Sequence, residues 1–244
     1  RALGIPSVLG AVGLIDGVRT GDAVIIDGSA GLIVINPNVE TLKRFERRRA
    51  EIDKASKRLA RLKTLPAISR DGTEIRLQAN IELPIEMALV EQVAAQGIGL
   101  LRSEFMFMNR QSLPSEDEQF SVMRQIVEGM NGHPVTIRSL DVGADKASKA
   151  VIGEMDDSVT TALGVRGIRL SLLKPELLET QFRAMLRASN YGPVRILLPM
   201  VSTVKEVLQA RKLLESAAAK LRRKKVKIPA ALPPLGTMIE VPGA

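Results

Sequence analysis

Charged side chains follow two apolar runs in the middle of this 244-residue sequence. Arg102 and Glu104 come at the end of the first run, and Arg138 and Asp141 come at the end of the second. The planar guanidinium group of arginine donates two parallel hydrogen bonds to a phosphate or a carboxylate. Several arginines at one location therefore indicate a site for a small anion that carries one or both of these groups.

Three more residues extend this set. Arg166 follows Gly164-Val165, and Lys146 lies in a polar loop after Asp141. Glu240 lies in the apolar run Met-Ile-Glu-Val, where a carboxylate is costly unless it is paired or bound to a metal. Mg²⁺ commonly binds through few protein carboxylates together with substrate oxygens. A structural network of arginine–carboxylate pairs explains any one motif equally well, but explains all of them together less well.

The elements that carry these residues alternate between strand and helix. Apolar alternation and short apolar runs predict strands over 75–81, 97–105, 134–142, 194–201 and 235–241. Apolar residues spaced by three and four predict helices over 85–96, 115–130, 162–173, 175–189 and 203–225. This order is typical of an α/β protein with a parallel sheet and right-handed crossovers.

Two architectures fit such a sheet, a (β/α)₈ barrel and an open doubly wound sheet. Neither a Gly-x-Gly-x-x-Gly after the first strand nor a Walker A sequence is present, which disfavours a nucleotide-binding open sheet. Polar residues at the strand ends favour the barrel, in which the chemistry lies at the carboxyl ends of the strands; these ends carry Asn80, Arg102 with Glu104, Arg138 with Asp141, and Glu240. We therefore expect a partial (β/α)₈ TIM barrel of about five strands that continues beyond residue 244.

The first 66 residues differ from the rest. Short apolar runs bounded by turn residues predict strands over 23–28 and 31–37, which are too few residues to bury a core of their own. Residues 38–63 have a narrow apolar stripe on a charged helix, as expected on a surface or between two domains. We therefore divide the chain into a β segment at 1–37, a basic linker helix at 38–66 and the barrel part at 67–244.

Composition excludes several classes of function. The formal charge of +8 comes mainly from two runs, 38–64 and 220–227, and aromatic residues make up only 2% of the chain, so a nucleic-acid surface is not expected. Without cysteine, thiolate chemistry and cysteine-bound zinc are excluded within this sequence. The single histidine, His133, lies in a predicted turn. No membrane span or targeting segment is predicted, which is consistent with the cytoplasm.

Several motifs, in their order, resemble the phosphoenolpyruvate–protein phosphotransferases (enzyme I of the bacterial sugar phosphotransferase system). These enzymes belong to the wider phosphoenolpyruvate-utilising family that includes pyruvate phosphate dikinase. The motifs are Leu-Arg-Ser-Glu-Phe-Met-Phe-Met, Arg-Ser-Leu-Asp-Val-Gly-Ala-Asp-Lys, Gly-Val-Arg-Gly-Ile-Arg-Leu, Arg-Ala-Ser, Leu-Pro-Met and Ile-Glu-Val-Pro-Gly-Ala. The stretch at 163–172 is also similar to the enzyme I module of fused multiphosphoryl transfer proteins.

The resemblance implies a function and a set of site residues. Arg102 and Arg138 would bind the phosphate and carboxylate of phosphoenolpyruvate, Arg166 and Lys146 would lie in the same mouth, and Glu240 would be a Mg²⁺ ligand. The phosphoryl group would pass to an enzyme histidine and then to a histidine-containing phosphocarrier protein of the HPr type for sugar uptake.

It also implies an organisation. Residues 1–37 would be the tail of a swivelling phosphohistidine domain, and the parent enzyme would be a cytoplasmic homodimer. The phospho-acceptor histidine and the proton-donor cysteine would lie outside this sequence, so the chain alone is expected to be inactive. The loop of Lys146 departs from the family pattern, with Ala144 in place of a glycine and Ala-Ser-Lys after the lysine.

Two other interpretations remain open. The first is a non-catalytic assembly module, in which the basic helix and the run at 220–227 bind an acidic partner. The second is a barrel lyase that acts on phosphoenolpyruvate or pyruvate. Such a lyase shares the arginines and Glu240 but does not need the β segment at 1–37, which disfavours it.

Overall fold

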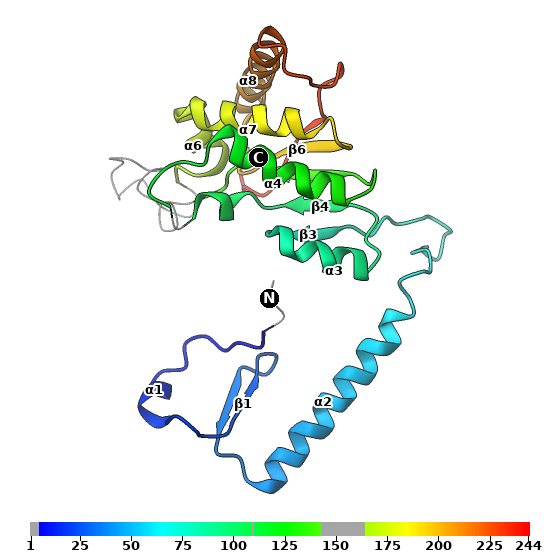
Figure 1. The fold of residues 1–244 in the computed structure, drawn as a ribbon, viewed down its shortest axis with the longest axis vertical. Helices are drawn as coiled ribbons and strands as arrows, with labels where there is room; N and C mark the ends of the chain where they lie inside the picture. Colours follow the sequence, from blue (N-terminus) through cyan, green and yellow to red (C-terminus); the bar gives the residue numbers. More distant parts are fainter. Residues whose placement is uncertain (1–4, 109, 143–163) are drawn as a thin grey trace. The chain divides into compact units, whose positions relative to one another are not determined.

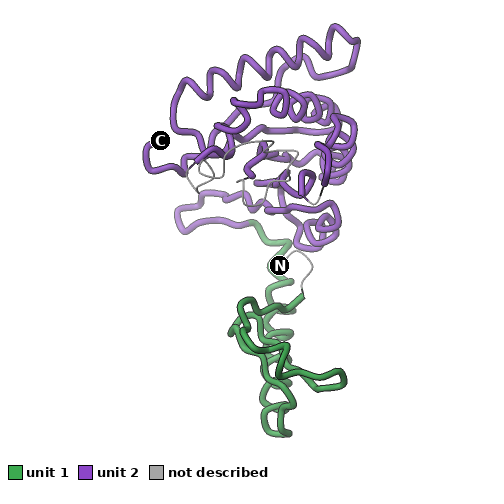
Figure 2. Tube along the Cα trace, turned by 90° about the vertical axis from the view of Figure 1, so that its left-hand side faces the viewer, with its two compact units in different colours: residues 1–66 green, residues 67–244 purple. Residues whose placement is uncertain are grey.

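A computed structural model describes residues 5–108, 110–142 and 164–244. The chain divides into two compact units, residues 1–66 and residues 67–244 (Figures 1 and 2). Both units contain the classes of element that the sequence predicts.

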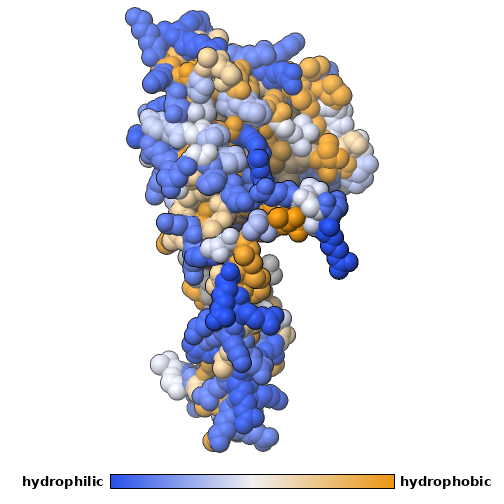
Figure 3. Space-filling model, turned by 90° about the vertical axis from the view of Figure 1, so that its right-hand side faces the viewer, coloured by the Kyte–Doolittle hydropathy of each residue, from blue (hydrophilic) through white to orange (hydrophobic). Residues whose placement is uncertain are grey.

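The first unit contains a hairpin and a long helix. Strands β1 (Val24–Asp27) and β2 (Leu32–Ile35) pair antiparallel after a single helical turn, α1 (Leu14–Gly17), which the sequence did not predict. Helix α2 (Val39–Ala60) begins where the Asn38 side chain accepts a hydrogen bond from the Thr41 backbone N–H at 2.8 Å. None of its residues is buried, and this unit presents a largely hydrophilic surface in Figure 3. The apolar stripe predicted for this helix therefore covers no core within the unit.

The second unit is built on a parallel sheet. Strands β3 (Ala79–Ile81), β4 (Ile98–Leu101), β5 (Val135–Arg138), β6 (Val194–Leu198) and β7 (Leu235–Thr237) lie side by side in the order of the sequence. Every neighbouring pair is parallel, so all five carboxyl ends meet at one edge. The predicted α/β class and parallel sheet are confirmed.

Helices connect the strands and cover the sheet. They are η1 (Pro84–Glu86) with α3 (Met87–Gln92), η2 (Glu104–Phe107), α4 (Glu116–Gly129), α6 (Gly167–Leu173), α7 (Pro175–Ala188) and α8 (Val204–Arg223). Helix α7 packs between α4 and α8 (Figure 1) and contributes Phe182 to the core. Ile98, Ile137 and Ile196, from three neighbouring strands, are almost completely buried beside it. The sheet is therefore a rigid base for the loops at its carboxyl edge.

Ion pairs join the three covering helices. Glu116 of α4 binds Arg183 and Arg187 of α7 at 2.6 and 2.7 Å, and Glu179 of α7 binds Lys220 of α8 at 2.6 Å. Burial alone would raise the pKa of Glu179, but Lys220 and Arg183 hold it below its ordinary value. The Arg-Ala-Ser motif that begins at Arg187 is thus part of the contact between α7 and α4.

Several predicted boundaries are wrong by a few residues. The strand predicted over 97–105 ends at Leu101, and its last residues form the 3-10 helix η2. The strand predicted over 235–241 ends at Thr237, so Glu240 lies outside it. Asn80, predicted as a strand-end residue, lies inside β3. Glu104 therefore lies in η2 and Glu240 in a loop, rather than in the strands predicted for them.

We expect Glu118 to make stability depend on pH at the acid end. The Ser115 backbone N–H, which donates to Glu118 at 2.7 Å, and the Arg110 guanidinium lower the pKa of Glu118 from 4.5 to about 2. The unfolded chain therefore takes up this proton at higher pH than the folded one, so the stabilising contribution is complete above pH 4.5 and is lost as the pH falls towards about 2.

Urea unfolding of the wild type and of Glu118→Gln checks this expectation. The wild type should be more stable at neutral pH, and the difference in unfolding free energy should shrink at pH values below 4.5. A difference that stays constant over this range would show that Glu118 carries no such pH dependence.

Candidate functional site

Four charged side chains meet where β4 and β5 end. Arg138 binds Glu104 at 3.1 Å and Asp141 at 3.3 Å, and Asp141 binds Arg166 at 3.0 Å. Arg138, Glu104 and Asp141 have side-chain exposures of 13%, 17% and 8%. In such a partly buried location, the two carboxylates fix the orientation of the arginine side chain and balance its positive charge.

The local backbone explains why these residues meet. The Arg102 backbone N–H donates to the Ile81 carbonyl at 3.0 Å, which continues the contact between β3 and β4 by one residue. The chain then turns through Ser103 into η2, and the turn places Glu104 against the end of β5. Glu104 accepts a hydrogen bond from the Asp141 backbone N–H at 3.0 Å as well as from Arg138. One carboxylate thus fastens the β4 loop to the β5 loop.

Arg102 lies at the same edge of the sheet but has a different partner from the one its spacing suggested. The sequence placed Arg102 and Glu104 on the same face of one strand. In the structure Arg102 binds Glu82, which follows β3, and both side chains are almost half exposed. Glu82 was missed by the sequence analysis, although its position directly after Ile81 is that of a strand-end residue.

Two of the arginines keep unused hydrogen-bonding capacity. The Nε atoms of Arg102 and Arg138 are buried and have no partner among the described residues. Buried donors are normally paired, and an unpaired one needs an explanation such as a functional role or a bound water or ion. The two Nε groups are therefore candidate donors to an anion at the edge of the sheet.

Arg166 reaches this cluster from the start of α6. Its Nε donates to Asp141 Oδ1 at 3.0 Å. Gly167, the next residue, has a φ of +54°, and Ile168 donates its backbone N–H to the Pro199 carbonyl at 3.1 Å. The structure thus brings Arg166 to Asp141 in the loop after β5, and the next residues of α6 contact the loop after β6.

Glu240 lies in the loop after β7, three residues beyond the strand. Its Oε1 accepts a hydrogen bond from the Met200 backbone N–H at 2.9 Å. Glu240 is exposed. The prediction that its carboxylate lies in an apolar strand, where it would need a partner, is therefore wrong. The described residues hold no group of three or more acidic or histidine side chains suited to a metal. Glu240 does offer one carboxylate, which suits an ion that takes its other ligands from substrate and water.

Two other residues singled out in the sequence are not part of this description of the site. Lys146 is outside the described residues. His133 precedes β5, in the turn where its backbone N–H donates to Met130, and so lies at the edge of the sheet opposite Arg138. A histidine at that edge does not contact an anion held by the arginines.

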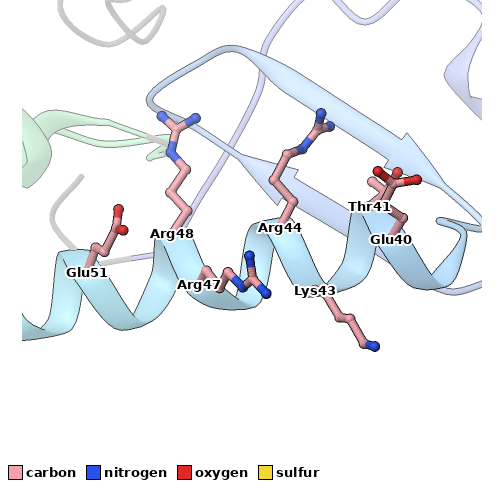
Figure 4. A pocket seen from close by; sticks show the side chains of 7 residues that line it. All are labelled: Glu40, Thr41, Lys43, Arg44, Arg47, Arg48 and Glu51. Carbon is pink, nitrogen blue, oxygen red and sulfur yellow. The ribbon is translucent and has the colours of Figure 1, made fainter.

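A separate hollow of about 730 Å³ lies beside helix α2 in the first unit. Arg44 and Arg48 extend from the helix towards the hairpin, whereas Lys43 points away (Figure 4). Arg48 binds Asp27 of β1 at 3.2 Å, and the carboxylates of Glu40 and Glu51 line the same hollow. The hollow therefore combines basic and acidic side chains, as the edge of the sheet does. Among the described residues, no helix has the length and apolarity needed to cross a membrane.

Comparison with known proteins identifies the family of this chain. Residues 56–244 match the family model of the PEP-utilising enzymes, PEP-binding domain. Over 245 residues the chain is 42% identical to a phosphoenolpyruvate-protein phosphotransferase of Cupriavidus necator, which covers all of this chain and 42% of the relative. It is 38% identical to the enzyme of the same name from Geobacillus stearothermophilus and 36% identical to that of Staphylococcus carnosus, again over 42% of each relative. The chain thus spans less than half the length of these relatives, and it belongs to the PEP-utilising enzymes through their PEP-binding domain.

Proposed function

We propose that this chain binds phosphoenolpyruvate as part of a phosphoenolpyruvate–protein phosphotransferase. The observation that carries the proposal is the position of Arg138, held between Glu104 and Asp141 with its Nε unpaired among the described residues. Arg102, Arg138 and Arg166 bind the phosphate and carboxylate groups of the substrate, together with Lys146. Phosphoenolpyruvate carries both groups on three carbons, which suits several arginine forks at one edge of a sheet.

The proposed architecture is a (β/α)₈ barrel that begins at residue 67. An open doubly wound sheet reverses its strand order at a switch point, whereas a barrel adds each strand beside the last. The order β3-β4-β5-β6-β7 has no reversal, which supports the barrel. Residues 38–66 then form the linker helix, and residues 1–37 the end of a swivelling phosphohistidine domain.

The proposed reaction also needs groups other than these arginines. The bond between phosphorus and the enol oxygen breaks as a bond to an imidazole nitrogen forms, and the enolate of pyruvate then takes up a proton. The arginines neutralise the phosphoryl group during this in-line transfer. The acceptor histidine passes the group to an HPr-type phosphocarrier protein for sugar uptake, in a cytoplasmic homodimer. His133 takes no part, because it lies at the opposite edge of the sheet.

A divalent metal fits this site through Glu240. When bound, Mg²⁺ neutralises negative charge on the phosphoryl oxygens. Glu240 would hold the ion through its carboxylate, which the Met200 backbone N–H orients by donating a hydrogen bond to Oε1.

Calorimetric titration of the chain with phosphoenolpyruvate and MgCl₂ tests the proposed function. We expect binding that is tighter than that of inorganic phosphate or pyruvate alone, since the arginines hold both ends of the substrate. Equal or absent binding of all three would overturn the proposal. With ³²P-labelled phosphoenolpyruvate the chain alone should retain no phosphate, and label that disappears in His133→Gln would show that the histidine was placed in the wrong role.

A chimaera tests phosphoryl transfer. In it, this chain replaces the matching segment of the Cupriavidus necator relative. The chimaera should phosphorylate a histidine-containing phosphocarrier protein, and Arg138→Lys in the chimaera should not. An active chimaera that ignores Arg138→Lys would favour an assembly role for this chain over a substrate-binding one. Charge reversal at Arg47 and Arg49 should leave phosphoryl transfer unchanged, because both residues lie in helix α2 of the first unit, outside the proposed substrate site.

Glu240→Gln is expected to weaken metal-dependent binding without unfolding the chain. The amide oxygen of glutamine still accepts the Met200 N–H hydrogen bond, but the negative charge that attracts the ion is lost. Phosphoenolpyruvate affinity in MgCl₂ should fall by about tenfold or more, which corresponds to roughly 1.4 kcal/mol. Titrations with and without MgCl₂ check this, and equal losses in both would show that Glu240 does not act through the metal.

A further inference from the structure

Gln181 of helix α7 lies beneath the two loops that carry the charged cluster. Its side chain is 1% exposed. Oε1 accepts a hydrogen bond from the Leu140 backbone N–H at 2.9 Å, and Nε2 donates to Ser103 Oγ at 3.2 Å. Ser103 lies between Arg102 and Glu104, and Leu140 directly precedes Asp141. One buried amide group therefore touches both loops immediately behind their charged residues.

The chemistry of the contacts fixes the orientation of this amide. A backbone N–H can only donate, so the oxygen of Gln181 must face Leu140 and the nitrogen must face Ser103. Ser103 and Leu140 are almost completely buried, with exposures of 0% and 2%. Water cannot replace either bond at such positions, so each donor and acceptor depends on Gln181.

Two consecutive backbone N–H groups of the β5 loop thus donate to side chains from two different elements. Leu140 donates to Gln181 of the helix layer, while Asp141 donates to Glu104 of the β4 loop at 3.0 Å. Gln181 also holds Ser103, the residue before Glu104. The contacts form a closed ring through Gln181, Ser103, Glu104, Asp141 and Leu140. A change at one member of the ring therefore shifts the carboxylates that orient Arg138.

We propose that Gln181 is a positioning residue for the phosphoenolpyruvate site, which sets the spacing of the β4 and β5 loops without touching the substrate. The inference rests on the proposed function for its effect on substrate. The ring itself is a property of the chain and is tested without any ligand.

Gln181→Met is the informative variant, because methionine has a similar length, cannot donate to Ser103 and is only a weak acceptor for the Leu140 N–H. Amide hydrogen exchange at Leu140 and Asp141 should speed up by about 10- to 100-fold relative to wild type, while exchange at Ile137 in β5 stays slow. The affinity for phosphoenolpyruvate should fall by roughly tenfold or more at a temperature where both proteins are folded.

Leu186→Ala in the same helix is the matched control. Leu186 is fully buried and apolar, so its truncation destabilises α7 without removing a polar contact to the loops. This control should lower the melting temperature while leaving phosphoenolpyruvate affinity and Asp141 exchange at their wild-type values. If it lowers the affinity as much as Gln181→Met does, Gln181 has only a structural role, and the proposal is overturned.

Ser103→Ala completes a double-mutant cycle. Alone it should give part of the increase in Leu140 exchange, and added to Gln181→Met it should give little more, because the shared bond is already lost. Unchanged exchange at Leu140 and Asp141 in Gln181→Met overturns the positioning role whatever the substrate does. A wild-type chain that fails to bind phosphoenolpyruvate overturns the proposed function instead, and the exchange data still decide the role of Gln181.

Discussion

Replacing Arg138 with alanine is expected to lower both the stability of residues 67–244 and the affinity for phosphoenolpyruvate. The substitution leaves Glu104 and Asp141, with side-chain exposures of 17% and 8%, facing each other without their shared cation. Removal of one partner from a buried ion pair costs about 3–5 kcal/mol, because the remaining charge stays desolvated. We expect the lower end of this range, since Arg138 and Glu104 are only partly buried. Affinity should fall by about 100-fold, since a charge-assisted bidentate contact contributes roughly 1.5–3 kcal/mol.

Arg102→Ala is the matched control for this result. Its partner Glu82 is almost half exposed, and ion pairs in water contribute only about 0–1 kcal/mol to stability. Arg102→Ala should therefore weaken substrate binding while leaving the urea midpoint nearly unchanged. Arg138→Lys should restore part of the stability, but not the affinity, because an ammonium group lacks the fork that spans both carboxylates. Equal stability losses in Arg102→Ala and Arg138→Ala would contradict the assignment of Arg138 as the centre of the cluster.

The order of elements was predictable because it depends on local patterns. Apolar alternation and helical spacing predicted all five strands and the helices α4, α7 and α8 at nearly their observed positions. The ends of the strands were not predictable to the residue, because they depend on neighbours. β4 ends at Leu101 since the next residues turn into η2, and nothing in the run Arg-Ser-Glu-Phe distinguishes that turn from a continued strand.

The residue types led to the prediction that Arg102, Arg138 and Arg166 bind an anion, but they did not predict the partners of these side chains. The fold brings Arg138 and Arg166 to Asp141. Spacing alone paired Arg102 with Glu104. In the parallel order of β3, β4 and β5, Arg102 instead binds Glu82, and Glu104 binds Arg138. Such pairings cross from strand to strand, so they require the topology.

The contacts of Gln181 with the two loops have no local signature in the sequence. Gln181 lies about 40 residues from Leu140 and nearly 80 from Ser103, and on α7 it looks like any polar residue of an amphipathic helix. Its 1% exposure is what distinguishes it, and burial of a polar side chain is visible only in the fold.

Gly167→Ala is expected to displace Arg166 and to destabilise the contact between α6 and the β6 loop. Gly167 has a φ of +54°, a conformation that costs a residue with a side chain about 1–2 kcal/mol. A Cβ atom at this position would also lie 2.9 Å from Cβ and Cγ of Met200 and 3.2 Å from the Pro199 carbonyl oxygen. Met200 Cβ cannot move without its backbone, and the Met200 backbone has a φ of +60° and holds Glu240. Relief of the overlap should cost about 1–3 kcal/mol more.

Gly132→Ala separates these two costs. Gly132 has a φ of +90°, but a Cβ atom there would have no heavy atom within 4 Å, so this variant carries the backbone strain without the overlap. In urea unfolding Gly167→Ala should therefore lose more stability than Gly132→Ala by about 1–3 kcal/mol. Only Gly167→Ala should weaken phosphoenolpyruvate binding, because it shifts Arg166 away from Asp141 on one side and the Met200 N–H away from Glu240 on the other. Equal losses of stability in the two variants, with unchanged affinity in both, would mean that α6 and the β6 loop separate freely and that their close approach does not hold the site.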